Sequence, residues 1–525
     1  MPETKTKRKS LNLLKKGSGK LLRIVFSRTG LILCLLLAQF VLLFAGLFWF
    51  GEFLPHLFGG NLIFTLFMAL VLLKADHDPT VKLTWLIVIM VFPVFGAVLY
   101  WYSRRDLGHR ALKQVCNEQV QATRYAIDAS RRPAEQLAHE DPGAGAMTQY
   151  VRRSGCYPVY DRTAVTYFPQ GEDKFARMLE ELEKAERFIF LEYFIVDEGT
   201  MWGQILEVLA RKAAQGVEVR LMYDGFCELH LLPKDYPLRL KELGIQCKVF
   251  SPVVPFASTH YNYRDHRKIL VIDGHTAFNG GINLADEYIN EIDRFGHWKD
   301  TAVMLKGEAV KSFTLMFLQM WNVDTRVKDY HKFLSYPAMP QEAKGFVMPY
   351  ADSPLDNEMT GRQVYVDILN RARRYVHIMT PYLILDSQME NALRYAALRG
   401  VDVKLLLPGI PDKKLAFALA KTHYSALLDA GVKIYEYTPG FVHAKSFGCD
   451  DREAVVGTIN LDYRSLYHHF ECATYMHSVD AIGDIEADFQ RTVASCRRIT
   501  REIVRQEKWY VKLTGFLLKA LAPLL

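Results

Sequence analysis

The same short constellation of polar residues occurs twice in this chain, and this repetition constrains the fold more than any other feature of the sequence. Residues 263–283 read YRDHRKILVIDGHTAFNGGIN, and residues 440–460 read GFVHAKSFGCDDREAVVGTIN. Each stretch contains His, one residue, Lys, four residues and Asp, and each reaches an Asn at the same distance from its His. One such triple can arise by chance, but two at equivalent places of a duplicated unit indicate a shared function.

The segments around the two motifs follow one order of secondary structure. An apolar strand is followed by an amphipathic helix that stops at a glycine, and then by a second apolar strand. The predicted ranges are 187–196, 203–216 and 217–225 in the first copy and 374–385, 389–400 and 401–409 in the second. Strands that alternate with helices are typical of α/β folds. We therefore predict two duplicated α/β halves, each a mixed sheet flanked by helices, that face each other across a pseudo-twofold active site.

Hydrophobic residues make up half of the chain and are concentrated in its first hundred positions. Three apolar segments occur there, at 31–50, 61–73 and 83–102. The first and third are long enough to cross a bilayer, whereas the second could be a span, a re-entrant piece or an interfacial helix. We predict N-terminal transmembrane helices and a multi-pass protein of the cell membrane, with the number of crossings left open.

These patterns divide the chain into regions. They are a basic N-terminal tail (1–30), a transmembrane region (31–102), a connector (103–150), the first half (151–326), a linker (327–345), the second half (346–508) and a C-terminal amphipathic segment (509–525). The last segment is typical either of an interfacial helix or of a core helix. The formal net charge of +7 fits an anionic partner, which could be nucleic acid or an acidic membrane surface.

The residue types of the first motif predict an anion site that contains a nucleophile. His266 and Lys268 are two apart on a predicted strand and therefore point to the same face. Asp273 follows at an odd offset, past the end of that strand, so we do not expect it on this face. Gly281 allows the backbone to approach a ligand closely, and Asn283 offers an amide donor.

The second motif repeats this arrangement, and the two halves complement each other. One imidazole can attack phosphorus while the other protonates the leaving oxygen. Lysine and amide groups then hold the phosphoryl oxygens and offset charge in the transition state. The candidate catalytic residues are His266, Lys268, Asp273, His443, Lys445 and Asp450, and the candidate phosphate-binding residues are Gly281, Asn283, Thr458 and Asn460. This chemistry requires no metal and no cofactor.

Carboxylates are expected to orient the two imidazoles. Glu471 begins a strand-like run after the second motif, and Asp300 holds the analogous place after the first. We predict the orienting role for both, with a surface or helix-capping acid as the alternative.

The paired HxKxxxxD motifs, each followed by a small-residue turn and Asn, resemble the phospholipase D superfamily. Further strings resemble the bacterial cardiolipin synthases of that superfamily, among them LEYFIVDEGT, GGINLADEY, HWKDTAVMLKGEAV and GTINLDYRSLYHHFE. The resemblance covers nearly the whole chain from about residue 31 onward. Two departures are YDGFCE, which affects the expected acceptor pocket, and Lys299 in HWKD, where Arg is usual.

The resemblance implies a covalent phosphohistidine, with His266 as nucleophile and His443 as general acid and then base, although the roles could be exchanged. It implies transfer of a phosphatidyl group from one phosphatidylglycerol to another, with release of glycerol. Phosphatidylglycerol and the lipid bilayer are the expected partners, and nucleic acid is not expected. A bacterial plasma membrane is the expected location.

Four other functions keep the same motifs. A phospholipase D-type hydrolase would use water as acceptor, and a related transferase would use another alcohol or phosphatidylethanolamine. A nuclease would cut phosphodiesters in DNA, but the apolar N-terminal segments argue against it. A membrane scaffold with a degenerate site is the least favoured reading, because both motifs are intact.

Overall fold

The computed structural model describes residues 58–75, 79–104, 109–127, 130–252, 263–325, 328–336, 339, 341–356 and 358–522. The predicted basic tail and the apolar segment 31–50 lie outside these residues. The chain forms two compact units. One comprises Met1–Asp106 with Val253–Ala257, and the other comprises Leu107–Pro252 with Ser258–Leu525.

The first unit contains three short apolar helices, α3 (Phe58–Lys74), α4 (Pro79–Val91) and α5 (Pro93–Arg104). Buried side chains such as Leu72 and Ile89 join them. The prediction of one continuous helix at 83–102 is wrong, because this segment is divided between α4 and α5. Pro93 lacks a backbone N–H and cannot continue the preceding helix. In the described ranges, no helix combines the length and apolarity needed to cross a bilayer.

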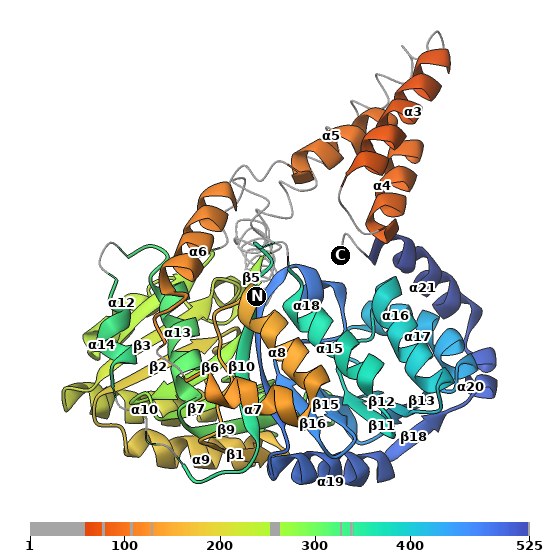
Figure 1. The fold of residues 1–525 in the computed structure, drawn as a ribbon. Coiled ribbons are helices and arrows are strands. Elements are labelled where there is room, and N and C mark those ends of the chain that lie inside the picture. The colour runs from red at the N-terminus through yellow and green to blue at the C-terminus, as the bar shows by residue number, and fades with distance from the viewer. Residues whose placement is uncertain are drawn as a thin grey trace, which may run out of the picture. The chain divides into compact units, whose positions relative to one another are not determined.

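The first half of the larger unit is a seven-stranded mixed sheet (Figure 1). Its order is β1 (Thr163–Phe168), β9 (Ala302–Gly307), β7 (Thr276–Gly280), β6 (Lys268–Ile272), β2 (Phe188–Tyr193), β3 (Glu218–Asp224) and β4 (Gln246–Phe250). Strand β2 is parallel to β3 and antiparallel to β6.

Helices cover both faces of this sheet. Side chains along each strand alternate between the two faces, and apolar side chains on each face pack against the helices there. Ile189 and Leu191 of β2 join the core beneath α9 (Gly171–Glu183) and α10 (Thr200–Ala214). Phe190 points to the other face and stacks on Phe317 of α13 (Val310–Trp321), with ring centroids 4.5 Å apart.

The second half repeats this arrangement around its own sheet. The order is β10 (Phe346–Asp352), β17 (His469–His477), β16 (Glu453–Gly457), β15 (Ser446–Cys449), β11 (Tyr375–Met379), β12 (Asp402–Pro408), β13 (Lys433–Tyr437) and β18 (Cys496–Ile499). Strand β11 is parallel to β12 and antiparallel to β15, as β2 is to β3 and β6. The covering helices are α15 (Thr360–Arg371), α16 (Ser387–Leu398), α17 (Lys414–Asp429) and α19 (Ala481–Ala494).

The predicted glycine stops occur at equivalent helices of the two halves. Gly216 follows α10 with φ +92°, and Gly400 follows α16 with φ +93°. This left-handed conformation favours glycine and ends the helix before the next strand. The sequence prediction of two mixed sheets flanked by helices is therefore confirmed.

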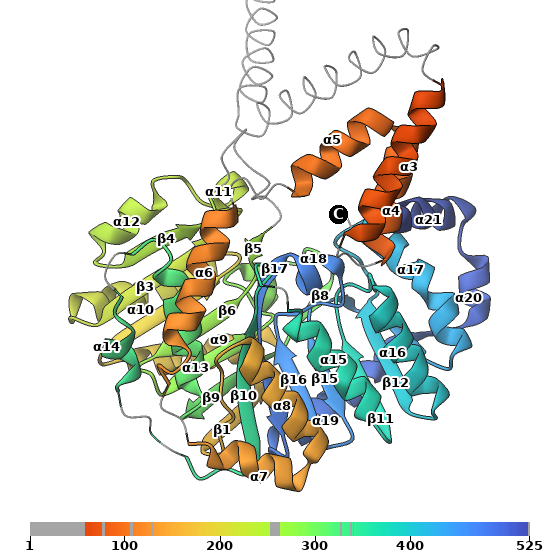
Figure 2. The same cartoon turned by 45° about the horizontal axis from the view of Figure 1, so that its top comes forward.

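The two halves share one hydrophobic core. They also exchange backbone at two places, and Figure 2 shows one of them, where β5 (Arg264–Asp265) lies next to β17. Strand β8 (His297–Lys299) of the first half pairs with β14 (Gly440–Val442) of the second. Strand β5 likewise pairs with β17. These pairings place the segment just before each histidine motif beside the other half.

The predicted connector and linker pack into this core as well. The connector forms α6 (His109–Thr123), α7 (Arg132–Glu140) and α8 (Pro142–Ser154). Gln319 of α13 donates to Thr123 Oγ1 at 2.8 Å, which ties α6 to the first half. In the linker, Phe333 lies edge-on to Phe190, with ring centroids 4.8 Å apart.

Candidate active site

The two motifs lie at the strand starts where the two halves meet. His266 precedes β6 and Lys268 begins it, whereas Lys445 directly precedes β15, two residues after His443. All four side chains are buried. Because β6 and β15 occupy equivalent places in their sheets, the duplication brings the same chemical groups to the same place in each half.

Each half supplies the carboxylate that holds the imidazole of the other half. His266 Nδ1 lies 2.9 Å from Oε1 and 3.0 Å from Oε2 of Glu471. His443 Nδ1 lies 2.6 Å from Oδ2 of Asp300. Glu471 follows the second motif and Asp300 follows the first, so the two acids predicted to orient the imidazoles contact them crosswise.

The backbone repeats this exchange. The His266 N–H donates to Phe470 O at 3.0 Å, and the His443 N–H donates to Lys299 O at 2.7 Å. In each case the acceptor is the carbonyl of the residue before the orienting acid. Both histidines are therefore fixed by a main-chain and a side-chain bond to the opposite half.

Burial keeps both imidazoles neutral in the unliganded site. It lowers the pKa of His443 to about 4, with Lys445 adding to the effect and Asp300 opposing it. Burial also lowers the pKa of His266 well below its ordinary value, with Glu471 opposing the effect. Burial alone would raise the pKa of Glu471, but its contacts with His266 and His469 hold that pKa below the usual range. A neutral imidazole that donates Nδ1–H to a carboxylate keeps a lone pair on Nε2, the atom a nucleophile needs.

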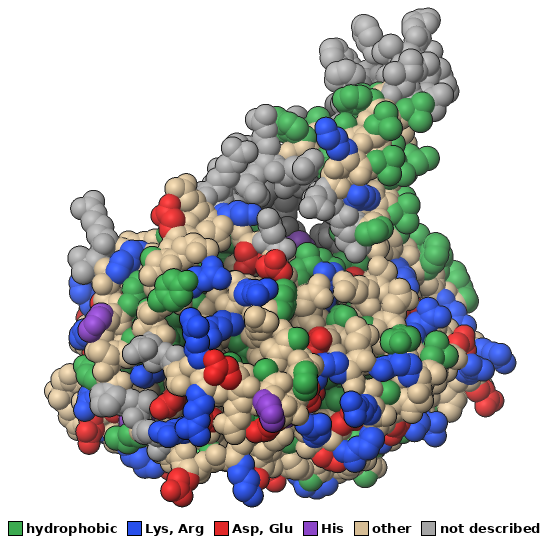
Figure 3. All heavy atoms as spheres, viewed as in Figure 1, with side chains coloured by type: hydrophobic (Ala, Val, Ile, Leu, Met, Phe, Trp, Pro, Cys, Tyr) green, Lys and Arg blue, Asp and Glu red, His purple; other side chains and the backbone are tan. Residues whose placement is uncertain are grey.

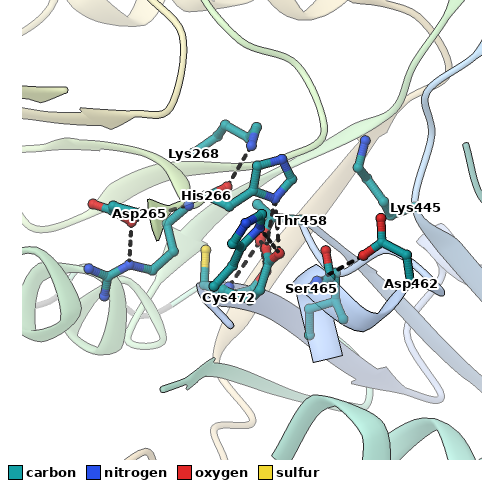
Figure 4. A network of polar contacts seen from close by, with 12 residues as sticks. Asp265, His266, Lys268, Lys445, Thr458, Asp462, Ser465 and Cys472 are labelled. Carbon is teal, nitrogen blue, oxygen red and sulfur yellow. Dashed lines mark hydrogen bonds and ion pairs between the residues drawn. The ribbon is translucent and has the colours of Figure 1, made fainter. Parts of the chain in front are cut away.

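Two buried lysines supply positive charge near the histidines. Burial lowers the pKa of Lys268 to about 8, opposed by the negative charge of Glu471. Burial lowers the pKa of Lys445 to about 7, and the nearby Lys268 contributes to this lowering. Figure 4 shows the two lysines on either side of the His266 imidazole. Together they form a site suited to a phosphoryl anion.

The four predicted phosphate-binding residues have different surroundings. Gly281 faces Asp300, and a Cβ there would lie 2.1 Å from its Oδ1, so only glycine admits this carboxylate. The Asn283 amide accepts from the Ile195 N–H at 3.0 Å and donates to Tyr288 Oη at 2.7 Å.

Their counterparts in the second half differ. The Thr458 hydroxyl donates to Glu471 Oε2 (Figure 4). Asn460 Oδ1 is buried and has no hydrogen-bond partner among the described residues. Buried polar atoms are normally partnered, so Asn460 Oδ1 is available to accept a hydrogen bond from a hydroxyl group of a ligand.

The motif aspartates are not brought to the histidines. Asp273 lies at the far end of β6, where its carboxylate accepts the N–H groups of Glu186, Arg187 and Phe188 at 2.7–2.8 Å. Asp450 does the same at the end of β15, with the N–H groups of residues 373–375. Both have positive φ, +52° and +54°. They anchor the start of the neighbouring strand, so their position supports a structural role and not the predicted catalytic one.

We expect Asp273→Asn to destabilise the protein without impairing its chemistry. The amide keeps the side-chain shape and the positive φ but loses the charge and at least one of the three acceptor bonds, which costs about 2–4 kcal/mol. Thermal unfolding should show a lower midpoint, while turnover per folded molecule stays within about twofold. Asp450→Asn should behave alike. A large loss of turnover at unchanged thermal stability would contradict the structural role.

Several residues of the site carry no signal in the sequence. The rings of Tyr288 and Trp298 each lie 5.4 Å from His443, centroid to centroid. Phe194 and His469 flank His266 at 5.1 and 5.4 Å. Aromatic residues at these positions read as ordinary core in a sequence, because their neighbours come from distant segments.

A further buried lysine was also missed. Lys174 of α9 donates to Ile282 O at 3.3 Å, and burial lowers its pKa to about 7. Asp300 is the negative charge that opposes this lowering. Lysine on an amphipathic helix normally reads as a solvent-exposed residue, so periodicity alone could not place Lys174 beside the site.

Within the described part of the chain, one group of three side chains has the spacing of a metal site. His266, His469 and Glu471 offer ligand atoms that all lie within 4.8 Å of one another. Two histidines and a glutamate are a familiar zinc donor set. A cation would have to replace the hydrogen bond between His266 and Glu471. The arrangement seen is that hydrogen-bonded pair, with His469 Nδ1 3.8 Å from Glu471 Oε1.

Two duplicated α/β halves that share one buried pair of carboxylate-held histidines are the arrangement of the phospholipase D superfamily. A family model described as "Cardiolipin synthase, PLD-like domain" matches residues 178–321 and 365–493. A second, described as "Phospholipase_D-nuclease N-terminal", matches residues 63–105. The chain belongs to the cardiolipin synthase family of phospholipase D-like proteins.

Individual relatives cover most of this chain. An uncharacterized protein of Streptococcus mutans is 58% identical over 456 residues, which cover 87% of this chain and 99% of the relative. A cardiolipin synthase of Alkalihalophilus pseudofirmus is 33% identical over 499 residues, covering 93% and 99%. The crystal structure of a phosphatidylserine synthase from Haemophilus influenzae superposes with a TM-score of 0.54 at 14% identity, covering 73% and 98% of the two chains, and shows the shared fold.

Proposed function

We propose that this protein is a membrane-bound cardiolipin synthase that transfers a phosphatidyl group between two phosphatidylglycerol molecules. The observation that carries the proposal is the crosswise pair His266–Glu471 and His443–Asp300. Relatives at 33% identity that are named cardiolipin synthase support the choice of substrate.

In the first step, His266 Nε2 attacks the phosphorus of the donor lipid. The bond from phosphorus to the glycerol oxygen breaks, and His443 gives its proton to that oxygen, so that glycerol leaves. The product is a phosphatidyl group bound to His266. Lys268 and Lys445 offset the negative charge that develops on the phosphoryl oxygens.

In the second step, His443 takes the proton of a glycerol hydroxyl on the acceptor phosphatidylglycerol. The hydroxyl oxygen attacks phosphorus, the phosphorus–nitrogen bond breaks, and His266 returns to its neutral form. The product is cardiolipin. Glycerol exchange is the same step with free glycerol as acceptor, and hydrolysis is the same step with water.

The surroundings of the two imidazoles support these roles. Burial lowers the pKa of His266 well below its ordinary value, so this imidazole stays unprotonated and nucleophilic. A bound phosphodiester places a negative charge beside His443 and raises its pKa toward protonation. Asp300 then stabilises the imidazolium that acts as general acid.

Attachment to the cell membrane is part of the proposal. In the N-terminal unit, Leu66, Phe67, Leu70 and Leu73 of α3 are each more than half exposed. Figure 3 shows hydrophobic side chains gathered on these helices. Exposed apolar surface of this kind favours a lipid environment, and diacyl substrates remain in the bilayer because each buried CH₂ contributes about 0.8 kcal/mol.

The test is a product analysis with the purified full-length protein in phosphatidylglycerol vesicles. With label in the glycerol head group and in an acyl chain, we expect one free glycerol for each cardiolipin formed. Phosphatidic acid as the main lipid product would identify a hydrolase instead, and a product that appears only with added alcohol or phosphatidylethanolamine would identify another transferase.

A further inference from the structure

A groove in the second half lies next to the candidate site and is not used by the chemistry above. It is formed by α17, α18 (Tyr463–Tyr467) and α21 (Trp509–Leu521) and has a volume of about 560 Å³. This volume lies within the range of about 300–1,000 Å³ that is usual for small-molecule sites. Its walls are mostly apolar and include Ile384, Ala416, Leu419, Leu518 and Ala522.

The inner end of the groove reaches the residues around His443. Asp462, which lines the groove, lies within electrostatic range of Lys445. Tyr382, another lining residue, lies within electrostatic range of Tyr288, whose ring packs edge-on against His443. Figure 4 shows Asp462 at the Lys445 side of the polar network. This end of the groove therefore lies next to the Lys445 side of the candidate site.

The rim of the groove carries positive charge. Lys413 directly precedes α17 and Lys414 begins it, and both are exposed. The exposed Arg464 of α18 also lines the groove. Lys413 Nζ lies 5.0 Å from the centroid of the Tyr382 ring, so its cation is held at the inner part of the rim. Cations above an apolar groove complement a ligand with one anionic phosphate and apolar chains.

Apolar surface continues from the groove onto α21. Leu513, Phe516 and Leu517 of this helix are between 48% and 70% exposed, and Leu415 at the groove is 61% exposed. An amphipathic helix with such a face lies at a membrane surface. The predicted C-terminal amphipathic segment thus borders the groove, and acyl chains could enter it from the bilayer.

We propose that this groove binds the acceptor phosphatidylglycerol, with an acyl chain along the apolar walls and its phosphate near Lys413 and Lys414. The inference rests on the proposed function, in which His443 protonates the leaving glycerol oxygen in the first step and takes the proton of the acceptor hydroxyl in the second. A lipid held in this way presents its terminal glycerol to His443. The donor lipid and the water-accessible acceptors do not need the groove.

The test compares two reactions that share the donor and the phosphohistidine. One is cardiolipin formation, and the other is exchange of labelled free glycerol into phosphatidylglycerol. Ala416→Trp fills the groove, and the double variant Lys413→Gln/Lys414→Gln removes the rim charge. We expect each to slow cardiolipin formation about tenfold and to leave glycerol exchange within about twofold.

A matched control removes the same charge nearby. Lys508 and Lys512 are exposed on or next to α21 and lie outside the groove, so Lys508→Gln/Lys512→Gln should leave the ratio of the two reactions unchanged. Retained glycerol exchange also shows that each variant is folded. Equal losses in both reactions, or no loss in either, would overturn the groove assignment. A wild-type protein that performs neither reaction would overturn the proposed function itself, and with it this inference.

Discussion

Replacing His266 by alanine should abolish both cardiolipin formation and the covalent intermediate. Without the Nε2 lone pair no phosphorus–nitrogen bond can form, and removal of a catalytic nucleophile typically costs at least about 10³-fold in turnover. The measurement is retention of acyl-labelled lipid on the protein after a denaturing quench near neutral pH, because phosphohistidine is labile in acid and the acyl esters are labile in alkali. Wild type should retain label during turnover, and His266→Ala should retain none.

The two histidines can be distinguished by the leaving group. A phosphatidyl ester of 4-nitrophenol needs no proton to leave, so His443→Ala should still release about one equivalent of nitrophenol per protein and then stop with lipid attached. With phosphatidylglycerol as donor, the same variant should form almost no intermediate. Accumulation of lipid on His266→Ala, and not on His443→Ala, would show that the two roles are exchanged.

Removing the charge of either orienting acid should reproduce the defect of the histidine in the opposite half. Glu471→Gln loses the carboxylate that holds His266, and Asp300→Asn loses the one that holds His443. A neutral amide no longer fixes the imidazole tautomer or stabilises its charged form, which costs about 10²–10⁴-fold in turnover. We expect Glu471→Gln to slow intermediate formation from both donors, and Asp300→Asn to spare the nitrophenyl donor.

A matched control exists elsewhere in the second half. Glu486 bonds to His377 Nδ1 at 2.9 Å on the side of β11 that faces α19. Glu486→Gln removes the same kind of carboxylate–imidazole pair outside the site and should change turnover by no more than about twofold. If Glu471→Gln instead behaved like His443→Ala, the crosswise pairing would be wrong.

Local patterns in the sequence were sufficient for much of the architecture. The strand near 187–196 is β2, the helix near 203–216 is α10, and their repeats are β11 and α16. Alternation of apolar residues, helical periodicity and glycine stops depend on a few neighbouring residues, so they can be read without knowledge of the fold. The two motifs could be recognised for the same reason, because their spacing is local and occurs twice.

The roles within the site depended on contacts that no local pattern contains. From their positions in the motifs, Asp273 and Asp450 were predicted to be catalytic residues. The structure instead places them at the far ends of their strands, where they are bonded to backbone N–H groups. Conversely, Lys174 and Tyr288 carry no motif and yet lie beside the histidines. A β-strand rises about 3.3 Å per residue. Residues that stand close together in a motif can therefore lie at opposite ends of one strand.

The sequence by itself thus determined that this chain has two equivalent α/β halves, each bearing His, Lys and a carboxylate after the motif. Only the tertiary structure decided that the carboxylates are exchanged. Strand β8 runs beside β14, and β5 runs beside β17, which carries Asp300 to His443 and Glu471 to His266. These partners are 143 and 205 residues apart in the chain. Their meeting depends on how two sheets pack over a common core, and side-chain periodicity within either half holds no information about that packing.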